Sequence, residues 1–146
     1  MITIRPHRLF NLVSTPSYEA RLVKIVLPNQ RTPMLLDTAI LLTLAKLVDP
    51  RTYFEFGTFL GIQLLNMAAN LPDCRVYTMD LDEESARAVI QDENDRPLTV
   101  EHLEAKDMLA FVGTSCEKRI TYLRGDSNTY DFSSLQELRN TGLRLH

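Results

Sequence analysis

The sequence contains few of the residues that form disulfides or bind metals. It has two cysteines and three histidines among 146 residues. The cysteines, Cys74 and Cys116, do not form a CxxC pair, and no cysteines and histidines have the spacing of a zinc site. We therefore expect two reduced thiols in a cytoplasmic protein, and no bound metal.

Long apolar runs are also missing. The first residues, Met1 to Leu12, include arginines but lack the apolar stretch of a signal peptide. The segment Ala39 to Val48 is interrupted by Thr43 and Lys46 and is too short to span a bilayer. We therefore expect a soluble protein with no membrane partner.

The sequence has no strong excess of charge of one sign, since its formal net charge is −3. Proteins that wrap nucleic acid non-specifically carry a basic excess, so no nucleic-acid partner is expected. The region before residue 32 is locally basic, but scattered charges of this kind are more typical of a solvated surface. With 45% hydrophobic and 24% charged residues, the composition fits one compact domain.

Short runs of β-forming residues alternate with segments of helical spacing. Strands are predicted at Tyr53 to Gly57, Arg75 to Met79 and Ile120 to Leu123. This alternation implies right-handed crossovers, a parallel sheet and a spatial strand order of 3-2-1. The predicted fold class is therefore α/β, with a Rossmann-like sheet that forms one mononucleotide-binding half of a doubly wound fold.

Helices are predicted around these strands from caps and apolar spacing. They are Pro33 to Val48 (capped by Thr32), Leu60 to Leu71, a helix capped by Asp82, Thr99 to Gly113, and a short helix beginning with a capping box at Ser134. In the first helix the apolar residues at helical spacing are Leu36, Ile40, Leu44, Leu47 and Val48, and in the fourth the buried side is expected to hold Leu103, Met108, Leu109 and Val112.

Three regions are expected along the chain. Residues 1–31 form an N-terminal arm with a possible strand at 22–27, which Pro28 and Asn29 close. Residues 32–134 form the Rossmann-like half, and residues 135–146 form a tail of a different character.

In a parallel sheet of this kind, ligands bind beyond the carboxyl ends of the strands. The first strand ends in a Glu-x-Gly-x-x-x-Gly pattern, formed by Glu55, Gly57 and Gly61. Gly57 suits a tight turn that lets a ligand lie against the backbone, and Gly61 suits close approach of the next helix. Dinucleotide-binding loops have glycine where Glu55 stands, and a carboxylate there would repel a pyrophosphate. A ligand without phosphates and with a positive charge fits better.

Acidic residues also follow the second and third strands. Asp80 stands where a doubly wound fold places its ribose-binding acid, because a carboxylate accepts hydrogen bonds from two hydroxyl groups. Asp126 could accept from an adenine amine, and Ser127 could offer its backbone N–H to a ring nitrogen. Each residue also has a plain structural alternative: an exposed strand end for Glu55, turn glycines, a helix-preceding acid for Asp80, and a turn residue for Asp126. Because these residues occur in order at the ends of successive strands, we favour the interpretation that they bind a ligand.

These segments resemble the motifs of class I S-adenosylmethionine-dependent methyltransferases, especially O-methyltransferase-like members. Tyr53 to Gly61 resembles the glycine-rich first motif, Val76 to Asp82 the second, and Arg119 to Ser133 the stretch around the third strand. The resemblance implies the N-terminal half of that fold, S-adenosylmethionine as cofactor, and packing of Leu81 on the adenine. The cofactor-binding residues that it implies are Glu55, Gly57, Thr58, Gly61, Asp80, Leu81, Asp126 and Ser127.

The resemblance ends after residue 134, where the family continues into a fourth strand. This chain has no such apolar run, so we expect a C-terminally truncated form, and the metal-binding acids of catechol-type relatives have no counterpart. Either the chain is a truncated product, or it is a half-domain that a homodimer completes. A dimer would use the exposed edge of the first strand or the helix Pro33 to Val48.

The expected activity is methyl transfer from S-adenosylmethionine to an oxygen or nitrogen nucleophile of a small molecule. His102 and Asp131 are the available general bases, but neither has a pattern that supports the role, and no catalytic residue is assigned. The alternative is a non-catalytic, truncated methyltransferase-like module completed by oligomerisation. A nicotinamide-dependent oxidoreductase is disfavoured by Glu55 and by the glycine spacing.

Overall fold

The computed structural model describes residues 19–24, 35–89 and 109–135. The helices are α2 (Leu35–Val48), α3 (Ile62–Asn70) and α4 (Glu83–Val89), and the strands are β1 (Thr52–Phe56), β2 (Arg75–Asp80) and β3 (Ile120–Arg124). Two 3₁₀ turns, η2 (Glu117–Arg119) and η3 (Phe132–Ser134), flank β3. The three strands were therefore predicted within one or two residues of their ends.

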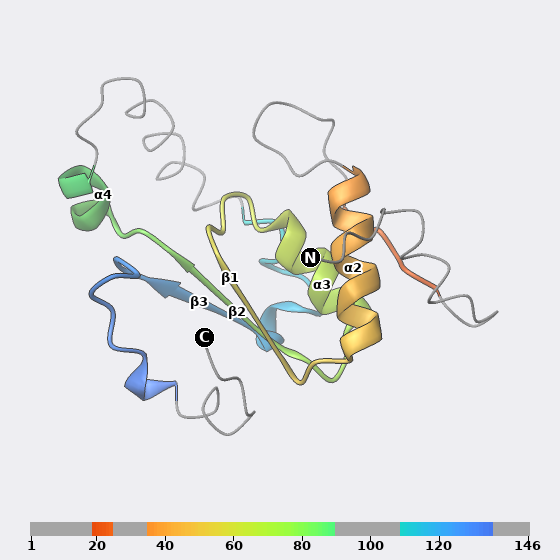
Figure 1. The fold of residues 1–146 in the computed structure, drawn as a ribbon. Helices are drawn as coiled ribbons and strands as arrows, with labels where there is room; N and C mark the ends of the chain where they lie inside the picture. Colours follow the sequence, from red (N-terminus) through yellow and green to blue (C-terminus); the bar gives the residue numbers. More distant parts are fainter. Residues whose placement is uncertain (1–18, 25–34, 90–108, 136–146) are drawn as a thin grey trace, which may run out of the picture.

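The three strands form a parallel sheet in the order β1-β2-β3 (Figure 1), which confirms the predicted α/β class and strand order. In this register Glu55 lies opposite Thr78, and Asp80 lies opposite Arg124. Parallel pairing brings the carboxyl ends of all three strands to the same edge. Residues of one strand alternate between the two faces, so Glu55, Thr78 and Asp80 belong to one face of the sheet.

The core lies between that face and α3. β2 is the central strand and is paired along both of its edges, and its residues from Val76 to Met79 have almost no solvent exposure. Leu64 and Met67 of α3 are fully buried and belong to the same apolar cluster as Val76. α2 packs on α3, and Figure 1 shows both helices on the same side of the sheet, whereas α4 lies beyond the carboxyl end of β2.

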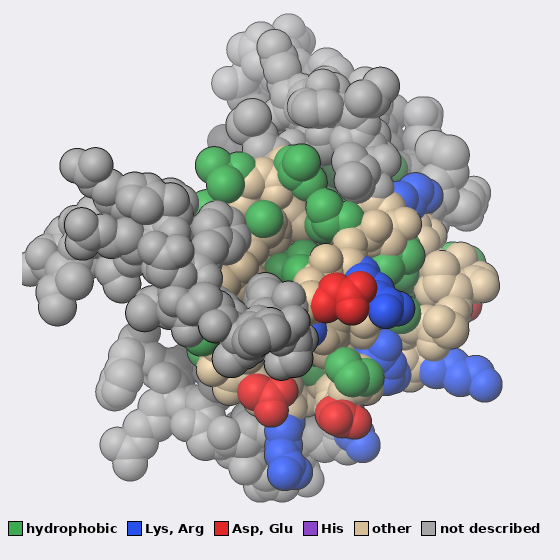
Figure 2. Space-filling model, turned by 90° about the vertical axis from the view of Figure 1, so that its right-hand side faces the viewer, with side chains coloured by type: hydrophobic (Ala, Val, Ile, Leu, Met, Phe, Trp, Pro, Cys, Tyr) green, Lys and Arg blue, Asp and Glu red, His purple; other side chains and the backbone are tan. Residues whose placement is uncertain are grey.

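The face that α2 buries differs from the predicted apolar stripe. Leu42 is fully buried and Thr38 nearly so, and the Thr38 hydroxyl donates to Oε1 of Gln63 on α3 at 3.0 Å. Leu36 and Val48 are 53% and 72% exposed. Leu44 and Leu47, which were expected on the same stripe, are exposed too. Figure 2 views the molecule from the α2 side and shows hydrophobic side chains at the surface beside charged ones.

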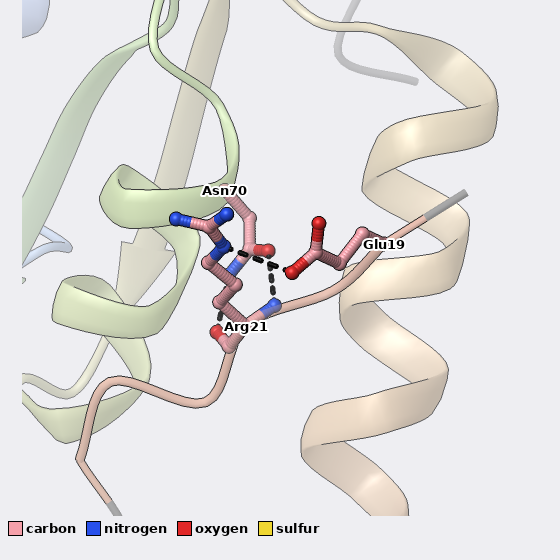
Figure 3. A network of polar contacts seen from close by, with 3 residues as sticks. All are labelled: Glu19, Arg21 and Asn70. Atoms are coloured by element: carbon pink, nitrogen blue, oxygen red, sulfur yellow. Dashed lines mark hydrogen bonds and ion pairs between the residues drawn. The ribbon is translucent and has the colours of Figure 1, made fainter. Parts of the chain in front are cut away.

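The segment 19–24 is held against α3 by two buried asparagine side chains. Asn66 Oδ1 accepts from the N–H of Val23 at 2.8 Å, and its Nδ2 donates to the carbonyl of Lys24 at 3.0 Å. Asn70 pairs in the same way with both backbone groups of Arg21, as Figure 3 shows. The predicted strand 22–27 is therefore absent over residues 22–24, because side chains rather than a strand satisfy this backbone. Residues 25–27 lie outside the described part.

Two of the predicted helix ends are turns in the structure. Residues 110–113 form turns that finish at Gly113, whose φ is +75°, and Val112 is 55% exposed rather than buried. Near the end of the chain, Asp131 accepts from the N–H of Ser133 and begins η3, so the predicted cap at Ser134 is replaced by one three residues earlier. The remaining parts of these two helices, and the predicted cap at Thr32, lie outside the described residues.

Among the described residues, none of the helices has the length and apolar character needed to cross a membrane.

Arg119 links η2 to the end of α3. Its guanidinium donates to the carbonyls of Ala68 at 2.6 Å, Leu71 at 2.8 Å and Cys74 at 3.4 Å. The last carbonyls of a helix have no partner within the helix, and a cation there is also favoured by the helix dipole.

We therefore expect Arg119→Met to lower the free energy of unfolding by about 2 kcal/mol, as for loss of hydrogen bonds from a charged donor. Urea unfolding followed by circular dichroism measures it. The matched control is Lys118→Met, which removes the exposed neighbouring cation. Equal losses in both variants would mean that charge, and not the three carbonyl contacts, accounts for the effect.

Candidate functional site at the carboxyl edge of the sheet

The loop after β1 is built from residues with left-handed backbone. Gly57 has a φ of +86°, Phe59 of +46° and Gly61 of +66°. The N–H of Gly57 donates to the carbonyl of Met79 at 2.8 Å, which continues the β1–β2 pairing by one residue before the chain turns. Gly61 then serves as the N-cap of α3. The predicted strand–turn–helix arrangement around the Glu-x-Gly-x-x-x-Gly pattern is therefore present.

Asp80 fixes this loop from the end of β2. Its Oδ2 accepts from the N–H groups of Thr58 at 3.2 Å and Phe59 at 3.3 Å, and its Oδ1 accepts from the N–H of Leu81 at 3.0 Å. The carboxylate therefore has a defined position at the carboxyl edge before any ligand arrives. Leu81, which follows it, is half-buried.

Thr58 supports the loop through its side chain. It is 4% exposed, and its hydroxyl oxygen lies 2.7 Å from that of Thr78, which is fully buried. This pair connects the loop to β2 two residues before Asp80. The hydroxyl of Thr58 is thus part of the support of the site, and its backbone faces the Asp80 carboxylate.

The two glycines of the loop differ in their surroundings. A Cβ added at Gly57 would meet none of the described atoms within 4 Å, so the space beside this residue is open. A Cβ at Gly61 would lie 2.8 Å from two ring carbons of Phe111, a buried core residue. The sequence predicted that Gly61 lets the following helix approach the strand or a ligand closely. In the structure, it is Phe111 that makes this approach.

Glu55 is half-buried on the same face, two residues before Gly57. Its Oε2 accepts from the hydroxyl of Tyr53 at 2.8 Å. Burial raises the pKa of the Glu55 carboxyl to about 7, although the Tyr53 hydrogen bond acts in the opposite direction. Glu55 therefore does not point freely into water, which was the plain alternative for this residue. Its charge responds to pH near neutrality.

The third strand end lies beside the second. The N–H of Gly125 donates to the carbonyl of Asp80 at 3.0 Å, which brings the residues after β3 next to the end of β2. Asp126 is half-buried and its Oδ1 accepts from the backbone and side-chain N–H groups of Asn128, so it organises a local turn. Ser127 is exposed. The structure thus joins Thr58 and Asp80 directly and places Glu55 on the neighbouring strand of the same face, with Asp126 and Ser127 one strand further along.

Sequence reasoning missed three residues that shape this site. Tyr53 could have been found, because residues two apart in a strand share a face. Thr78 carried a weaker signal as a polar residue inside a buried strand. The left-handed conformation of Phe59 had no signal, since a bulky residue rarely adopts it.

The two general-base candidates are Asp131 and His102. Asp131 caps η3 through Ser133, and His102 lies outside the described residues. Within the described ranges, no group of three or more acidic, cysteine or histidine side chains could hold a metal ion.

Comparison with solved structures gives several matches, and one of them is a distant likeness in fold. A solved chain described as "a putative O-methyltransferase from Klebsiella pneumoniae" has 21% sequence identity and a TM-score of 0.41. The match covers 78% of this chain and 41% of that one, so this chain corresponds to less than half of the neighbour's length. The likeness concerns the fold alone. The sequence matches no family model and no curated protein.

Proposed function

We propose that this chain binds S-adenosylmethionine at the carboxyl edge of its sheet and is the cofactor-binding part of a methyltransferase. The acceptor class that we propose is a small molecule with an oxygen or nitrogen nucleophile. The observation that carries the proposal is the placement of Glu55 and Asp80. They lie on one face, at the ends of adjacent strands, on either side of a glycine loop with open space at Gly57.

The chemistry of these groups selects a ligand without phosphates. Two carboxylates near the ends of adjacent strands repel a pyrophosphate, which disfavours a dinucleotide, whereas they attract a sulfonium or an amine. Asp80, oriented by the loop amides, suits the ribose hydroxyls, which are hydrogen-bond donors. In this proposal Leu81 packs on the adenine, and Asp126 and Ser127 make polar contacts with it.

The bound cofactor would supply an already activated methyl group on its sulfonium. The residues of this chain then bind and orient it, since methyl transfer requires in-line alignment of donor and acceptor and exclusion of water. Glu55 would hold a cationic group, Gly57 would allow backbone approach, and Asp80 would hold the ribose. No residue of this chain is assigned to the acceptor.

Calorimetric titration with S-adenosylhomocysteine tests the proposal. We expect micromolar binding by the wild type, no heat with NAD, and binding weakened about tenfold or more in Asp80→Ala, as for loss of a charged hydrogen-bond acceptor. The matched control is Asp73→Ala, which removes an exposed acid from a turn and should bind as the wild type does.

The Asp80→Ala variant also loses the loop contacts, so Asp80→Asn, which keeps one acceptor oxygen for the amides, separates the two effects. Binding that survives in Asp80→Asn would assign Asp80 to loop support only. Absence of binding by the wild type would favour the second function, a non-catalytic module with a methyltransferase-like fold. The exposed leucines of α2 are the observation that favours such a module, and a homodimer through α2 or the β1 edge stays a prediction.

A further inference from the structure

Tyr53 and Glu55 form a polar pair on the face of the sheet that α3 covers. They occupy alternate positions of β1 and so project to the side of the sheet that α3 covers. The Tyr53 ring packs against the core cluster, and its hydroxyl donates to Glu55 Oε2 at 2.8 Å. The phenol is therefore anchored in the core, while Glu55, whose carboxyl it contacts, stands two residues before Gly57 in the chain.

No basic side chain of the described residues forms an ion pair with Glu55. The other elements packed around it offer little charge. α3 carries no ionisable side chain between Ile62 and Asn70, and the register partner on β2 is the uncharged Thr78. The ionisable neighbours are Asp80 at the end of β2 and, on the Tyr53 side, the thiol of Cys74 just before β2, whose pKa burial raises. One strand further from Glu55, β3 contributes Tyr122 and Arg124 on the same face.

A half-buried carboxylate that has no cationic partner in the described part of the chain is costly there, and a ligand cation would offset that cost. Burial and the neighbouring acid raise the pKa of Tyr53 well above its ordinary value, so its hydroxyl stays a hydrogen-bond donor at all pH values of interest. A donated hydrogen bond favours the charged form of the acceptor.

We propose that Tyr53 is a positioning residue for a cationic ligand group: its hydroxyl holds the Glu55 carboxyl beside the glycine loop and favours its charged form. The ligand group is an amine or a sulfonium. This inference rests on the proposed function, since the ligand is taken to be an adenosyl compound with such a group. Tyr53 acts through Glu55 and does not itself contact the ligand.

The test compares Tyr53→Phe, which removes only the oxygen, with the wild type across pH 6 to 8.5. The probes are S-adenosylhomocysteine, which carries a cationic amine, and 5′-methylthioadenosine, which carries no cationic group. We expect wild-type affinity for the first probe to rise with pH as Glu55 ionises. In Tyr53→Phe the rise should move to higher pH, which leaves binding about fivefold weaker at pH 7 and nearly equal at pH 8.5. Affinity for the second probe should be the same in both proteins.

Tyr122→Phe is the matched control, because Tyr122 lies on the same face of the sheet, two strands away on β3, whereas the hydrogen bond to Glu55 comes from Tyr53. A pH profile in Tyr53→Phe that coincides with the wild type would overturn the inference while leaving the proposed function intact. Failure of both probes to bind the wild type would overturn the proposed function. In that case the Glu55 carboxyl is followed by carbon NMR, and a titration midpoint that does not move in Tyr53→Phe would overturn the positioning role as well.

Discussion

Replacing Gly61 by alanine is expected to lower the free energy of unfolding by about 3 kcal/mol, from left-handed backbone strain together with overpacking. The backbone at Gly61 has a φ of +66°, and the new Cβ would lie 2.8 Å from ring carbons of Phe111. Phe111 is 4% exposed, so its ring cannot move into solvent without opening the core. Urea unfolding measures the loss.

Gly57→Ala is the matched variant, because it has the same kind of backbone without the contact. Its φ is +86°, but its added Cβ meets none of the described atoms within 4 Å. Its cost should therefore be about 1 kcal/mol, from strain alone. Adding Phe111→Leu to Gly61→Ala should recover part of the larger loss. Equal losses in the two alanine variants would show that Phe111 is not the cause.

The fold was predictable because its boundaries are marked locally. Asp49 and Pro50 follow the end of α2, Pro72 follows α3, and Asp82 caps α4 by accepting from the N–H of Ser85 at 2.7 Å. Strands with β-forming residues alternate with these helices, and the handedness of crossovers then leaves one strand order. Local chemistry was therefore sufficient for the order of elements and for the sheet.

The orientation of α2 was not predictable from the same sequence. Its residues, LLDTAILLTLAKLV, place leucine or another apolar residue on every side of the helix, so periodicity does not select a face. The choice is made by partners distant in sequence: Leu42 enters the core, and Thr38 bonds to Gln63. The segment 19–24 is a similar case, because its pairing depends on two asparagines of α3.

The acidic residues of the candidate site could be predicted from the sequence, but the contacts that hold them in position could not. Glu55 and Asp80 stand at strand ends, where topology alone brings them together. The contacts that hold them differ. Asp80 accepts hydrogen bonds from backbone N–H groups of the loop, which has left-handed backbone, and Glu55 accepts one from the hydroxyl of Tyr53. The contact of Phe111 with Gly61 joins residues fifty positions apart, so it could not be predicted without the tertiary structure. Such contacts follow from packing, which no pattern of residues encodes locally.

Glu55→Gln is expected to make the protein more stable above neutral pH. The pKa of Glu55 is about 7 in the folded protein against an ordinary value of 4.5, so the folded state keeps a proton that the unfolded chain releases. Wild-type stability from this group is therefore fully present below about pH 4.5 and is lost as the pH rises through 7. The difference corresponds to about 3 kcal/mol.

The glutamine keeps an acceptor for the Tyr53 hydroxyl and never ionises. Its variant should thus match the wild type near pH 4 and exceed it by up to about 3 kcal/mol at pH 8. Urea unfolding at a series of pH values measures the difference, with the exposed Glu84→Gln as a control that should show no such trend. A gain that is the same at every pH would mean that ionisation of Glu55 is not its source. A gain that grows with pH would show that folding disfavours the ionised form of Glu55, the form that a bound cation would favour.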